Sequence, residues 1–549
     1  MKEEPLKVAV LGAGGVGAWI AKMMRDRGHE VLASTGNDDT RRALELLGVG
    51  VNNWRWSQGV SWKCWLDWEA DVWCVTIPPR GGQEEALRFH QELQHAVQLA
   101  KPQRLIWTSS TAVYGRDQSG IVSEDDAIHI ASRHTGVDML ALEKVHAQSR
   151  VPFVAMRFGG LFGPSRHPVA ALLKRIPVKE ADGTVQWVHE VDAAAACVHV
   201  ALHPNPALTA INVVAPHVAT RRSLIEAALS SDQLPDMEAG GRHRVVQSSI
   251  LESLGYGFLV PDPEVWVRSE PGLTTQGFWE GPYGRLHWTR HASGSAVVKG
   301  RALMVHGYKG FRDWGNWKGL AQRWAEVGWE VTRMDFSHNG HVPPFVEDCL
   351  DEEAWGANRY HMERDEVAFG LSSLAEPGMP LIVFGHSRGG AMAILGAYKH
   401  IATGGELAGI VACAPVSNLV ERLPKGEFLD VWKATNRMEV LNGRTGQVLC
   451  HPFAFYQETM SMADELNVET AAKKLACPIL VLHGDEDSAV DVNEGKDISV
   501  WATEGTFHLV RGGNHVFGMK HPWPSAREWP DALEVAWCAQ QEWLNKVLG

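Results

Sequence analysis

The sequence predicts an α/β protein with two successive domains, each built on a mainly parallel sheet flanked by helices. The chain has 549 residues, which exceeds the roughly 250–300 residues at which a single hydrophobic core stops growing. Short β-branched and apolar runs alternate with segments of helical periodicity along both halves. Each half also has a glycine-rich turn where a predicted strand passes into a predicted helix.

In the first half, the predicted strand 7–11 ends in the turn Gly12-Ala13-Gly14-Gly15-Val16-Gly17, and a helical segment follows. In such a turn, Gly12 permits the sharp bend, Gly14 lets a pyrophosphate approach the backbone, and Gly17 allows close helix–strand packing. Further strands are predicted at residues 30–35, 71–77, 104–110 and 152–158. The alternation predicts a Rossmann-type doubly wound parallel sheet that binds a dinucleotide. The alternative is that the glycines only make a tight crossover.

Three later segments resemble the extended short-chain dehydrogenases/reductases, the NAD-dependent epimerase/dehydratase group: WTSSTAVYG (107–115), RFGGLFGP (157–164) and WVHEVDAAAA (187–196). The resemblance implies an NAD(P)-binding domain over residues 1–264. It also implies a site role for Ser110, because the matching serine assists a Tyr-x-x-x-Lys pair in that group. The pair is absent here, since alignment on Glu143 puts Thr135 and Met139 in its two positions. The resemblance therefore narrows to atypical members, whose reaction stays open.

The cofactor prediction depends on a second departure from the group. The acidic residue expected at the end of the second strand, where it binds the ribose hydroxyls, is replaced by Ser34-Thr35, and Arg41 and Arg42 follow shortly. Loss of the acid with arginines nearby favours NADP over NAD, with Thr35 in the cofactor site. The alternative, a solvated helix face for the two arginines, stays open.

In the second half, a predicted buried strand at 380–384 leads to Ser387 within GHSRG, and a tightly packed helix begins at 389. A serine on such a strand–turn–helix elbow is held at the strand tip and needs a base and a carboxylate to become a nucleophile. Two later predicted strands lead to Asp487 and to His515. The order Ser387, Asp487, His515 is that of α/β-hydrolases. Asp487 is preferred to Asp485 because it fits the spacing G-x-x-D-x-x-V of these enzymes.

Another predicted strand ends at His306-Gly307-Tyr308, so the backbone N–H groups of Tyr308 and Arg388 are expected to form an oxyanion hole. Residues 270–549 resemble α/β-hydrolases. Within them MDFSHNG (334–340), GHSRGG, HGDED and GGNHVF are similar to carboxylesterases of the dienelactone hydrolase and cinnamoyl esterase type. We expect a connector at 265–272, a hydrolase domain at 273–549 that starts with a β-hairpin, and a lid insertion at about 416–472.

Together these patterns predict a two-domain enzyme. The C-terminal half is expected to cleave an ester or thioester through an acyl-serine intermediate without a cofactor, and the N-terminal half to bind NAD(P) as an atypical epimerase or reductase. In a second interpretation the N-terminal half is a non-catalytic nucleotide-binding, sensor or scaffold module. In a third, the hydrolase half is a peptidase or an acyltransferase.

The composition argues against nucleic acid, metal ions and membranes as partners. The net charge of -13 argues against nucleic-acid binding, which needs clustered Lys and Arg. The eight scattered cysteines show no zinc-ligand spacing, so no metal site is expected. The sequence shows no signal-peptide pattern and no apolar stretch long enough for a bilayer. We therefore expect a cytoplasmic enzyme with a small-molecule ester substrate, no membrane partner and an undetermined oligomeric state.

Overall fold

The computed structural model describes residues 4–115, 118–132, 135–147, 149–203, 208–229, 231–270, 273–293, 297–525 and 528–548. The chain divides into two compact units, one with residues 1–267 and 342–345, the other with residues 268–341 and 346–549. The predicted connector, 265–272, falls partly on helix α10 (Pro263–Ser269). Its residues 271 and 272 lie outside the described residues.

The N-terminal unit is built on a seven-stranded sheet in the order β11-β7-β5-β4-β1-β2-β3, and every neighbouring pair is parallel. The strands are β1 (Lys7–Leu11), β2 (Glu30–Ser34), β3 (Gly50–Asn52), β4 (Val72–Val75), β5 (Arg104–Ser110), β7 (Phe153–Phe158) and β11 (Ala210–Val213). The strands β2 and β3 lie in succession on one side of β1, and β4, β5, β7 and β11 lie in succession on its other side. The crevice at that switch point, at the carboxyl ends of the strands, is where ligands bind in such sheets.

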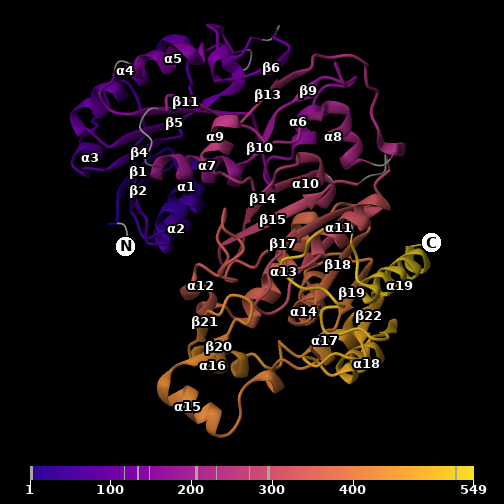
Figure 1. Cartoon of the computed structure of the whole chain (residues 1–549). Helices are drawn as coiled ribbons and strands as arrows, with labels where there is room; N and C mark the ends of the chain where they lie inside the picture. The colour runs from indigo at the N-terminus through magenta and orange to yellow at the C-terminus, as the bar shows by residue number, and fades with distance from the viewer. Residues whose placement is uncertain are drawn as a thin grey trace. The chain divides into compact units, whose positions relative to one another are not determined.

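Helices cover both faces of this sheet, as parallel strands with continuous apolar sequences require. Helix α1 (Gly15–Asp26) packs against α7 (Glu190–Leu202), whereas α4 (Gly82–Ala100) packs against α5 (Met139–His146) (Figure 1). The remaining helices of the unit are α2 (Asp38–Leu46), α3 (Lys63–Leu66), α6 (Pro168–Leu172), α8 (Arg221–Ala228), α9 (Ser249–Ser253) and α10.

Three two-stranded pairs extend the N-terminal unit beyond its main sheet. They are β8 (Gly160–Phe162) with β10 (Trp187–His189), β9 (Thr184–Val185) with β12 (Ala219–Thr220), and β6 (Gly120–Val122) with β13 (Arg244–Val246). Each pair joins segments that are far apart in the sequence.

The C-terminal unit is built on an eight-stranded sheet in the order β14-β15-β17-β16-β18-β19-β22-β23. The strands are β14 (Thr274–Glu280), β15 (Arg285–His291), β16 (Gly300–Val305), β17 (Trp329–Met334), β18 (Leu381–His386), β19 (Gly409–Cys413), β22 (Ile479–Gly484) and β23 (Gly505–Val510). The hairpin β14–β15 pairs antiparallel and joins β17 antiparallel, and all later pairs are parallel. The predicted fold class is confirmed in both units: a Rossmann-type sheet followed by an α/β-hydrolase sheet.

Apolar clusters lie on both faces of the second sheet. One face is covered by α13 (Tyr360–Leu374), α14 (Arg388–Ala402) and α17 (Val468–Lys474), the other by α11 (Trp317–Glu326) and α19 (Asp531–Leu548). Helices α12 (Glu352–Ala357) and α18 (Val492–Trp501) complete this framework. Trp324 and Trp329 are fully buried in one of the two clusters.

Between β19 and β22 the chain forms α15 (Glu427–Thr435), the hairpin β20 (Met438–Leu441) and β21 (Val448–His451), and α16 (Ala454–Ser461). This insertion precedes α17 and occupies the segment predicted to be a lid. Figure 1 shows the hairpin, α15 and α16 gathered on one side of the C-terminal unit.

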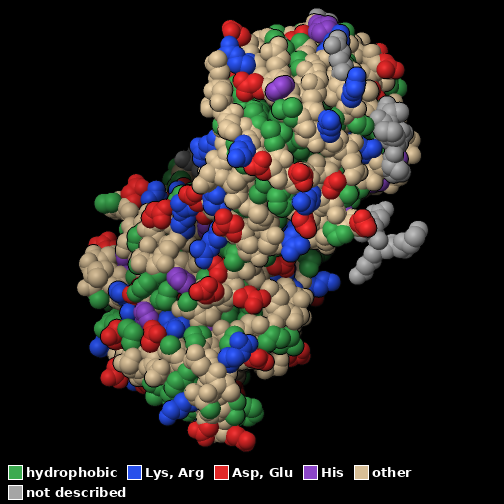
Figure 2. Space-filling view, turned by 90° about the vertical axis from the view of Figure 1, so that its left-hand side faces the viewer, with side chains coloured by type: hydrophobic (Ala, Val, Ile, Leu, Met, Phe, Trp, Pro, Cys, Tyr) green, Lys and Arg blue, Asp and Glu red, His purple; other side chains and the backbone are tan. Residues whose placement is uncertain are grey.

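Acidic and basic side chains are interspersed over the face seen in Figure 2. Among the described residues, no helix combines the length and the apolar character needed to cross a bilayer.

Candidate functional site

Ser387 lies at a sharp turn between β18 and α14, with φ 57° and ψ −125°. Non-glycine residues rarely adopt positive φ, and such strain is concentrated at functional sites. The turn closes because two glycines flank the serine. A Cβ atom on Gly385 would lie 2.1 Å from the Gly389 carbonyl oxygen, and one on Gly389 would lie 2.4 Å from the His306 carbonyl oxygen. The spacing of small residues around the serine is therefore required by backbone packing.

The structure brings Ser387, His515 and Asp487 together in one hydrogen-bonded chain. His515 Nε2 lies 3.0 Å from Ser387 Oγ, and His515 Nδ1 lies 2.8 Å from Asp487 Oδ2. The three residues come from three different connections at the carboxyl ends of β18, β22 and β23. With a proton on Nδ1, the imidazole donates to Asp487 and leaves Nε2 free to accept the serine proton.

Asp487 is held as a carboxylate by four hydrogen-bond donors. Its Oδ1 accepts the N–H groups of Ala489 (2.8 Å) and Val490 (2.9 Å), and Oδ2 also lies 3.2 Å from His483 Nε2. Burial alone would raise the pKa of Asp487, but hydrogen bonds from His483, His515 and Val490 outweigh it and lower the pKa well below its usual value. Asp485, by contrast, accepts the Gly512 N–H at 2.6 Å and contacts neither histidine.

His386, which directly precedes the serine, supports the orientation of His515. Its Nε2 lies 2.8 Å from the main-chain oxygen of His515. Burial lowers the pKa of His386 to about 3, so the imidazole is neutral at pH 7 and donates from Nε2 to that carbonyl. His386 therefore positions the backbone of His515.

The two predicted oxyanion donors lie on either side of Ser387. In the part of the chain that the structure describes, neither the Tyr308 N–H nor the Arg388 N–H has a hydrogen-bond acceptor. The Tyr308 segment is close to Ser387, because a Cβ atom on Gly307 would lie 3.0 Å from the Ser387 Cβ. Arg388 is the first residue of α14, where N–H groups have no partner within the helix. Both N–H groups are therefore free to bind a negatively charged oxygen.

The side chains of these two residues also pack on each other. The Arg388 guanidinium lies 4.3 Å from the centre of the Tyr308 ring and pairs with Glu363 at 2.6 Å. Both members of this ion pair are buried. Tyr308 Oη lies 3.0 Å from His451 Nε2 in the insertion hairpin. We call Glu363, Arg388, Tyr308 and His451 the oxyanion clamp, because they connect α13 and the insertion to both donor residues.

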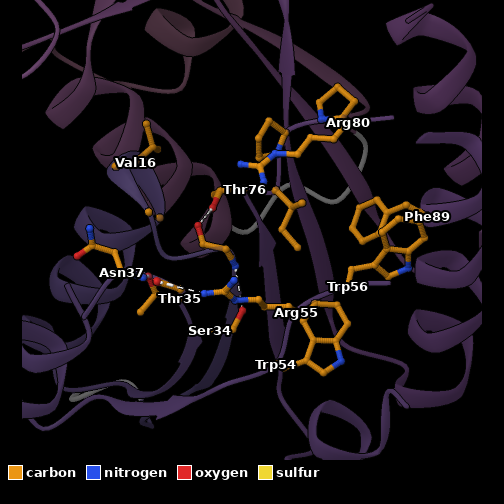
Figure 3. A pocket seen from close by; sticks show the side chains of 18 of the residues that line it. Val16, Ser34, Thr35, Asn37, Trp54, Arg55, Trp56, Thr76, Arg80 and Phe89 are labelled. Atoms are coloured by element: carbon orange, nitrogen blue, oxygen red, sulfur yellow. Dashed lines mark hydrogen bonds between the residues drawn. The ribbon is translucent and has the colours of Figure 1, made fainter. Parts of the chain in front are cut away.

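The N-terminal unit has a cavity of about 700 Å³ at the switch point of its sheet (Figure 3). The predicted residues Gly12, Gly14, Gly15, Val16, Gly17 and Thr35 line it. The other lining residues are Ser34 at the end of β2, Gly36 and Asn37 after it, Trp54–Trp56, Thr76–Arg80 after β4, Glu85, Ala86 and Phe89 on α4, and Leu161, Arg166 and Glu190.

Three glycines shape this cavity in different ways. Gly12 has φ +94°, and a Cβ atom there would meet Ile77 at 2.8 Å. A Cβ atom on Gly17 would lie 2.5 Å from Thr76 Oγ1, so this glycine lets α1 pack against the end of β4. Gly14 has open space for a Cβ atom, with nothing within 4 Å. Gly12 and Gly17 thus serve internal packing, whereas Gly14 opens toward the cavity.

An arginine does face the cavity beyond β2, but it is neither of the two expected from the sequence. Arg41 donates from Nη2 to the Thr35 carbonyl oxygen (3.0 Å) and does not line the cavity. Arg42 does not line it either. Arg55 lines it instead and donates from Nη2 to the Gly36 carbonyl oxygen (3.2 Å). Figure 3 shows Arg55 extending from the side of Trp54 and Trp56 toward Ser34 and Thr35.

Two of the predicted cofactor residues do not line this cavity. Ala13 is fully buried, and its N–H donates to the Ser34 carbonyl oxygen at 2.6 Å. Ser110 caps a short 3-10 turn by accepting the Ala112 N–H at 3.1 Å. Met139, in the position of the family lysine, is buried at the start of α5, and Thr135, in the position of the tyrosine, accepts the Val137 N–H at 3.3 Å.

Sequence reasoning missed Arg55, Glu363, His386 and His483. Arg55 stands between two tryptophans in a loop, and that grouping was the one local signal for it. Glu363 and His386 act through contacts whose partners lie on separate segments. His483 contacts Asp487, only four residues further along the chain. Within the described ranges, no cluster of three or more His, Cys, Asp or Glu side chains is arranged to hold a metal ion.

Comparison with protein families gives a match in the N-terminal unit. Residues 79–214 match the model of the NAD dependent epimerase/dehydratase family. The N-terminal half therefore contains an epimerase/dehydratase-type domain. The chain is also 28% identical over 277 residues to Protein YeeZ of Escherichia coli (strain K12), an alignment that covers 47% of this chain and 98% of that protein.

Solved structures are similar to about half of the chain. Est1E from Butyrivibrio proteoclasticus is 15% identical, with a TM-score of 0.38 and coverage of 50% of this chain and 98% of its own. The Bordetella bronchiseptica enzyme WbmG in complex with NAD is 16% identical, with a TM-score of 0.41 and coverage of 48% and 92%.

Proposed function

We propose that the C-terminal unit is a serine hydrolase that cleaves a carboxylic ester or thioester through an acyl-Ser387 intermediate. The observation that carries this proposal is the chain of contacts from Ser387 Oγ to His515 (3.0 Å) and from His515 to Asp487 (2.8 Å). The strained backbone of Ser387 and the free N–H groups of Tyr308 and Arg388 support it.

In the first half of the reaction, His515 Nε2 takes the Ser387 proton while Oγ forms a bond to the carbonyl carbon of the substrate. The carbonyl oxygen becomes an oxyanion and accepts hydrogen bonds from the Tyr308 and Arg388 N–H groups. Each such donor typically contributes about 3–4 kcal/mol to transition-state stabilisation. The C–O or C–S bond to the leaving group then breaks, and His515 returns the proton to the departing alcohol or thiol.

In the second half, His515 accepts a proton from water, and the oxygen of that water attacks the acyl carbon. The same N–H groups bind the second oxyanion. The bond to Ser387 Oγ breaks, Oγ regains its proton from His515, and a carboxylic acid leaves. Asp487 remains ionised throughout and keeps the imidazole in the tautomer that accepts from serine.

Hydrolysis of short p-nitrophenyl esters by the full chain tests this proposal. Ser387→Ala removes the nucleophile and should abolish acyl transfer. Ser373→Ala is a matched control, because Ser373 is exposed and its hydroxyl only donates to the Phe369 carbonyl. Activity that survives in Ser387→Ala would reject the assignment, as would equal loss in both variants. The aminolysis of p-nitrophenyl esters by added amines, and the cleavage of peptides, would separate an acyltransferase or a peptidase from an esterase.

For the N-terminal unit we propose binding of NAD(P), with NADP favoured, in the cavity at the glycine-rich turn. The residues fit such a ligand, because Gly14 leaves open space and the free N–H groups at the start of α1 suit a pyrophosphate. When bound, NAD(P) supplies hydride-transfer chemistry. Arg55 would hold the 2′-phosphate next to Thr35, because a guanidinium matches phosphate geometry and no acidic residue stands at the end of β2.

Fluorescence titration with NADPH and NADH tests the cofactor proposal. Arg55→Gln should weaken NADPH binding about tenfold and leave NADH binding unchanged. Arg88→Gln is the matched control, since Arg88 contacts Gln58 and Glu84 and does not line the cavity. Equal effects of Arg55→Gln on both nucleotides would reject the 2′-phosphate role, and no binding of either nucleotide by wild type would reject the cofactor site.

The reaction of this unit has two candidates. The first is an epimerase or reductase whose proton donor differs from the family tyrosine. The second is a non-catalytic nucleotide-binding module, and the placement of Thr135 and Met139 favours it, because methionine carries no acidic proton and an alcohol is a poor acid at neutral pH. Turnover of NADPH with a panel of carbonyl compounds supports the first candidate, and binding without oxidation supports the second.

All eight cysteines are free thiols, which is typical of a reducing compartment. We therefore also propose a cytoplasmic location.

A further inference from the structure

The N-terminal unit has a second cavity, of about 250 Å³, which shares no lining residue with the first. Arg221, Arg242, Arg244 and Glu180 contribute charged side chains to it, and Ala112 and Tyr114 form part of its wall. Three arginines and one glutamate thus line a small concave space. Guanidinium groups bind carboxylates and phosphates with matching geometry, so this lining suits an anion.

Arg244 is the most informative of the three. Its Nη1 donates to the main-chain oxygens of Tyr114 (3.1 Å) and Gly115 (3.2 Å), which fix the guanidinium at the cavity wall. Among the described residues it has no carboxylate within ion-pair distance. Burial lowers the pKa of Arg244. A partly buried positive charge without a counter-ion carries a desolvation cost, and a bound anion offsets that cost.

Arg221 approaches the same space from α8, whereas Arg244 lies in β13. Its Nη1 donates to the Glu180 main-chain oxygen at 2.9 Å, while its Nη2 lies 3.9 Å from the Glu180 carboxylate, at the limit of an ion pair. The backbone contact therefore holds the group in place, and its charge is only weakly compensated. Two guanidinium groups fixed by main-chain carbonyls form a preorganised fork for a planar or tetrahedral oxyanion.

The cavity also reaches the turn that Ser110 caps. Ala112 lines the cavity, and its N–H donates to Ser110 Oγ at 3.1 Å. A ligand held here would lie near the carboxyl end of β5, the edge of the sheet at which ligands of this fold bind.

We propose that this second cavity binds the carboxylate or phosphate group of a small anionic substrate on which the N-terminal unit acts. The substrate assignment rests on the NAD(P)-binding function proposed above, but anion binding itself does not require it. The volume suits an acid group with a few attached carbon atoms better than a whole nucleotide.

Calorimetric titration of the full chain, saturated with NADP, tests this proposal. The probes are inorganic phosphate in one arm and succinate in the other, and heat in either arm identifies the acid group that is preferred. Saturation with NADP fills the glycine-rich site, so that phosphate cannot bind there. Arg221→Gln and Arg244→Met should each weaken the preferred anion about tenfold. Arg222→Gln is the matched control, because Arg222 is the next residue on the same helix, pairs with Asp182 at 2.7 Å and does not line the cavity.

The absence of binding by wild type in both arms would overturn the proposal, and so would binding that Arg221→Gln leaves unchanged. Arg244 also holds two backbone carbonyls, so if Arg244→Met unfolds, Arg221→Gln decides the test. None of the three arginines lines the first cavity, and NADPH affinity should therefore be unchanged in every variant. If wild type fails to bind NADPH, the cofactor proposal fails. The anion titration is then run without nucleotide, and it still tests the second cavity, because anion affinity is compared between wild type and Arg221→Gln.

Discussion

Replacement of Asp487 by asparagine tests how the proposed hydrolase site sets the tautomer of His515. Asp487 Oδ1 accepts N–H groups from Ala489 and Val490 at 2.8 and 2.9 Å, while Oδ2 faces His515 Nδ1 at 2.8 Å. Two backbone donors require an acceptor at the Oδ1 position, so an asparagine must place its oxygen there. Its amide nitrogen then faces His515 and donates a hydrogen bond to Nδ1.

This reversal moves the imidazole proton to Nε2, where it faces Ser387 Oγ, so His515 no longer accepts the serine proton. In serine proteases the equivalent change of tautomer lowers kcat by about 10⁴-fold, which corresponds to ~5.5 kcal/mol of activation free energy. We expect a loss of this size in Asp487→Asn. His483 Nε2 lies 3.2 Å from the same carboxylate oxygen, so the amide also removes an acceptor from His483, and the variant should be less stable by about 1–3 kcal/mol.

Stopped-flow hydrolysis of p-nitrophenyl acetate measures kcat directly. A pH of about 7.5 is suitable, because the histidine side chain of a model peptide is mainly neutral there. Asp485→Asn is the matched control, since Asp485 only accepts the Gly512 N–H, and its kcat should stay near that of wild type. Asp487→Ala leaves either tautomer available and should be at least as active as Asp487→Asn. The reasoning is refuted if Asp487→Asn is nearly as active as wild type, or if Asp487→Ala is clearly the less active of the two.

Two further predictions concern the same unit. Burial raises the pKa of Glu366 to about 8, whereas in the unfolded chain it is about 4.3. The stability that protonated Glu366 contributes is therefore complete below the unfolded pKa and is lost as the pH rises through the folded pKa. Between these two pKa values the free energy of unfolding of wild type should fall by up to ~1.4 kcal/mol per pH unit. Urea unfolding from pH 5 to 9 should show a flatter profile for Glu366→Gln, and equal slopes in the two proteins would contradict the assignment. Arg388→Lys keeps the main-chain N–H and the charge but loses the planar contact with Tyr308, so kcat should fall about tenfold with KM little changed. Arg364→Lys, which alters an arginine paired with Asp365 and Glu465 instead, should leave kcat unchanged, and equal losses in both variants would argue against the oxyanion clamp.

The parts of the fold that sequence analysis predicted are those with local periodicity. Residues 7–11 were predicted as a strand and form Lys7–Leu11, because the four successive apolar residues after Lys7 suit a strand buried on both faces. The three residues of the proposed catalytic triad followed from chain order and from the glycines around Ser387. These signals lie within a few residues of one another or in a fixed order along the chain.

Contacts between distant segments could not be predicted in this way. Strand β13 pairs with β6 across more than a hundred residues, and strands of three residues are too short to show an alternating pattern. Arg55 was missed because its contact with Gly36 depends on the path of the loop after β3. The arginines that were expected, Arg41 and Arg42, lie outside the cavity, since the first turn of α2 directs Arg41 back to the Thr35 carbonyl.

The open space beside Gly14 has an evolutionary consequence. Gly12 and Gly17 are required by the protein's own atoms, whereas no atom of the folded chain occupies the space that a Cβ atom at position 14 would take. A ligand in the crevice would exclude a methyl group from that space. Related proteins that have lost nucleotide binding should therefore accept alanine or serine at position 14 while they keep the other two glycines. Related proteins that still bind the nucleotide should keep glycine at position 14.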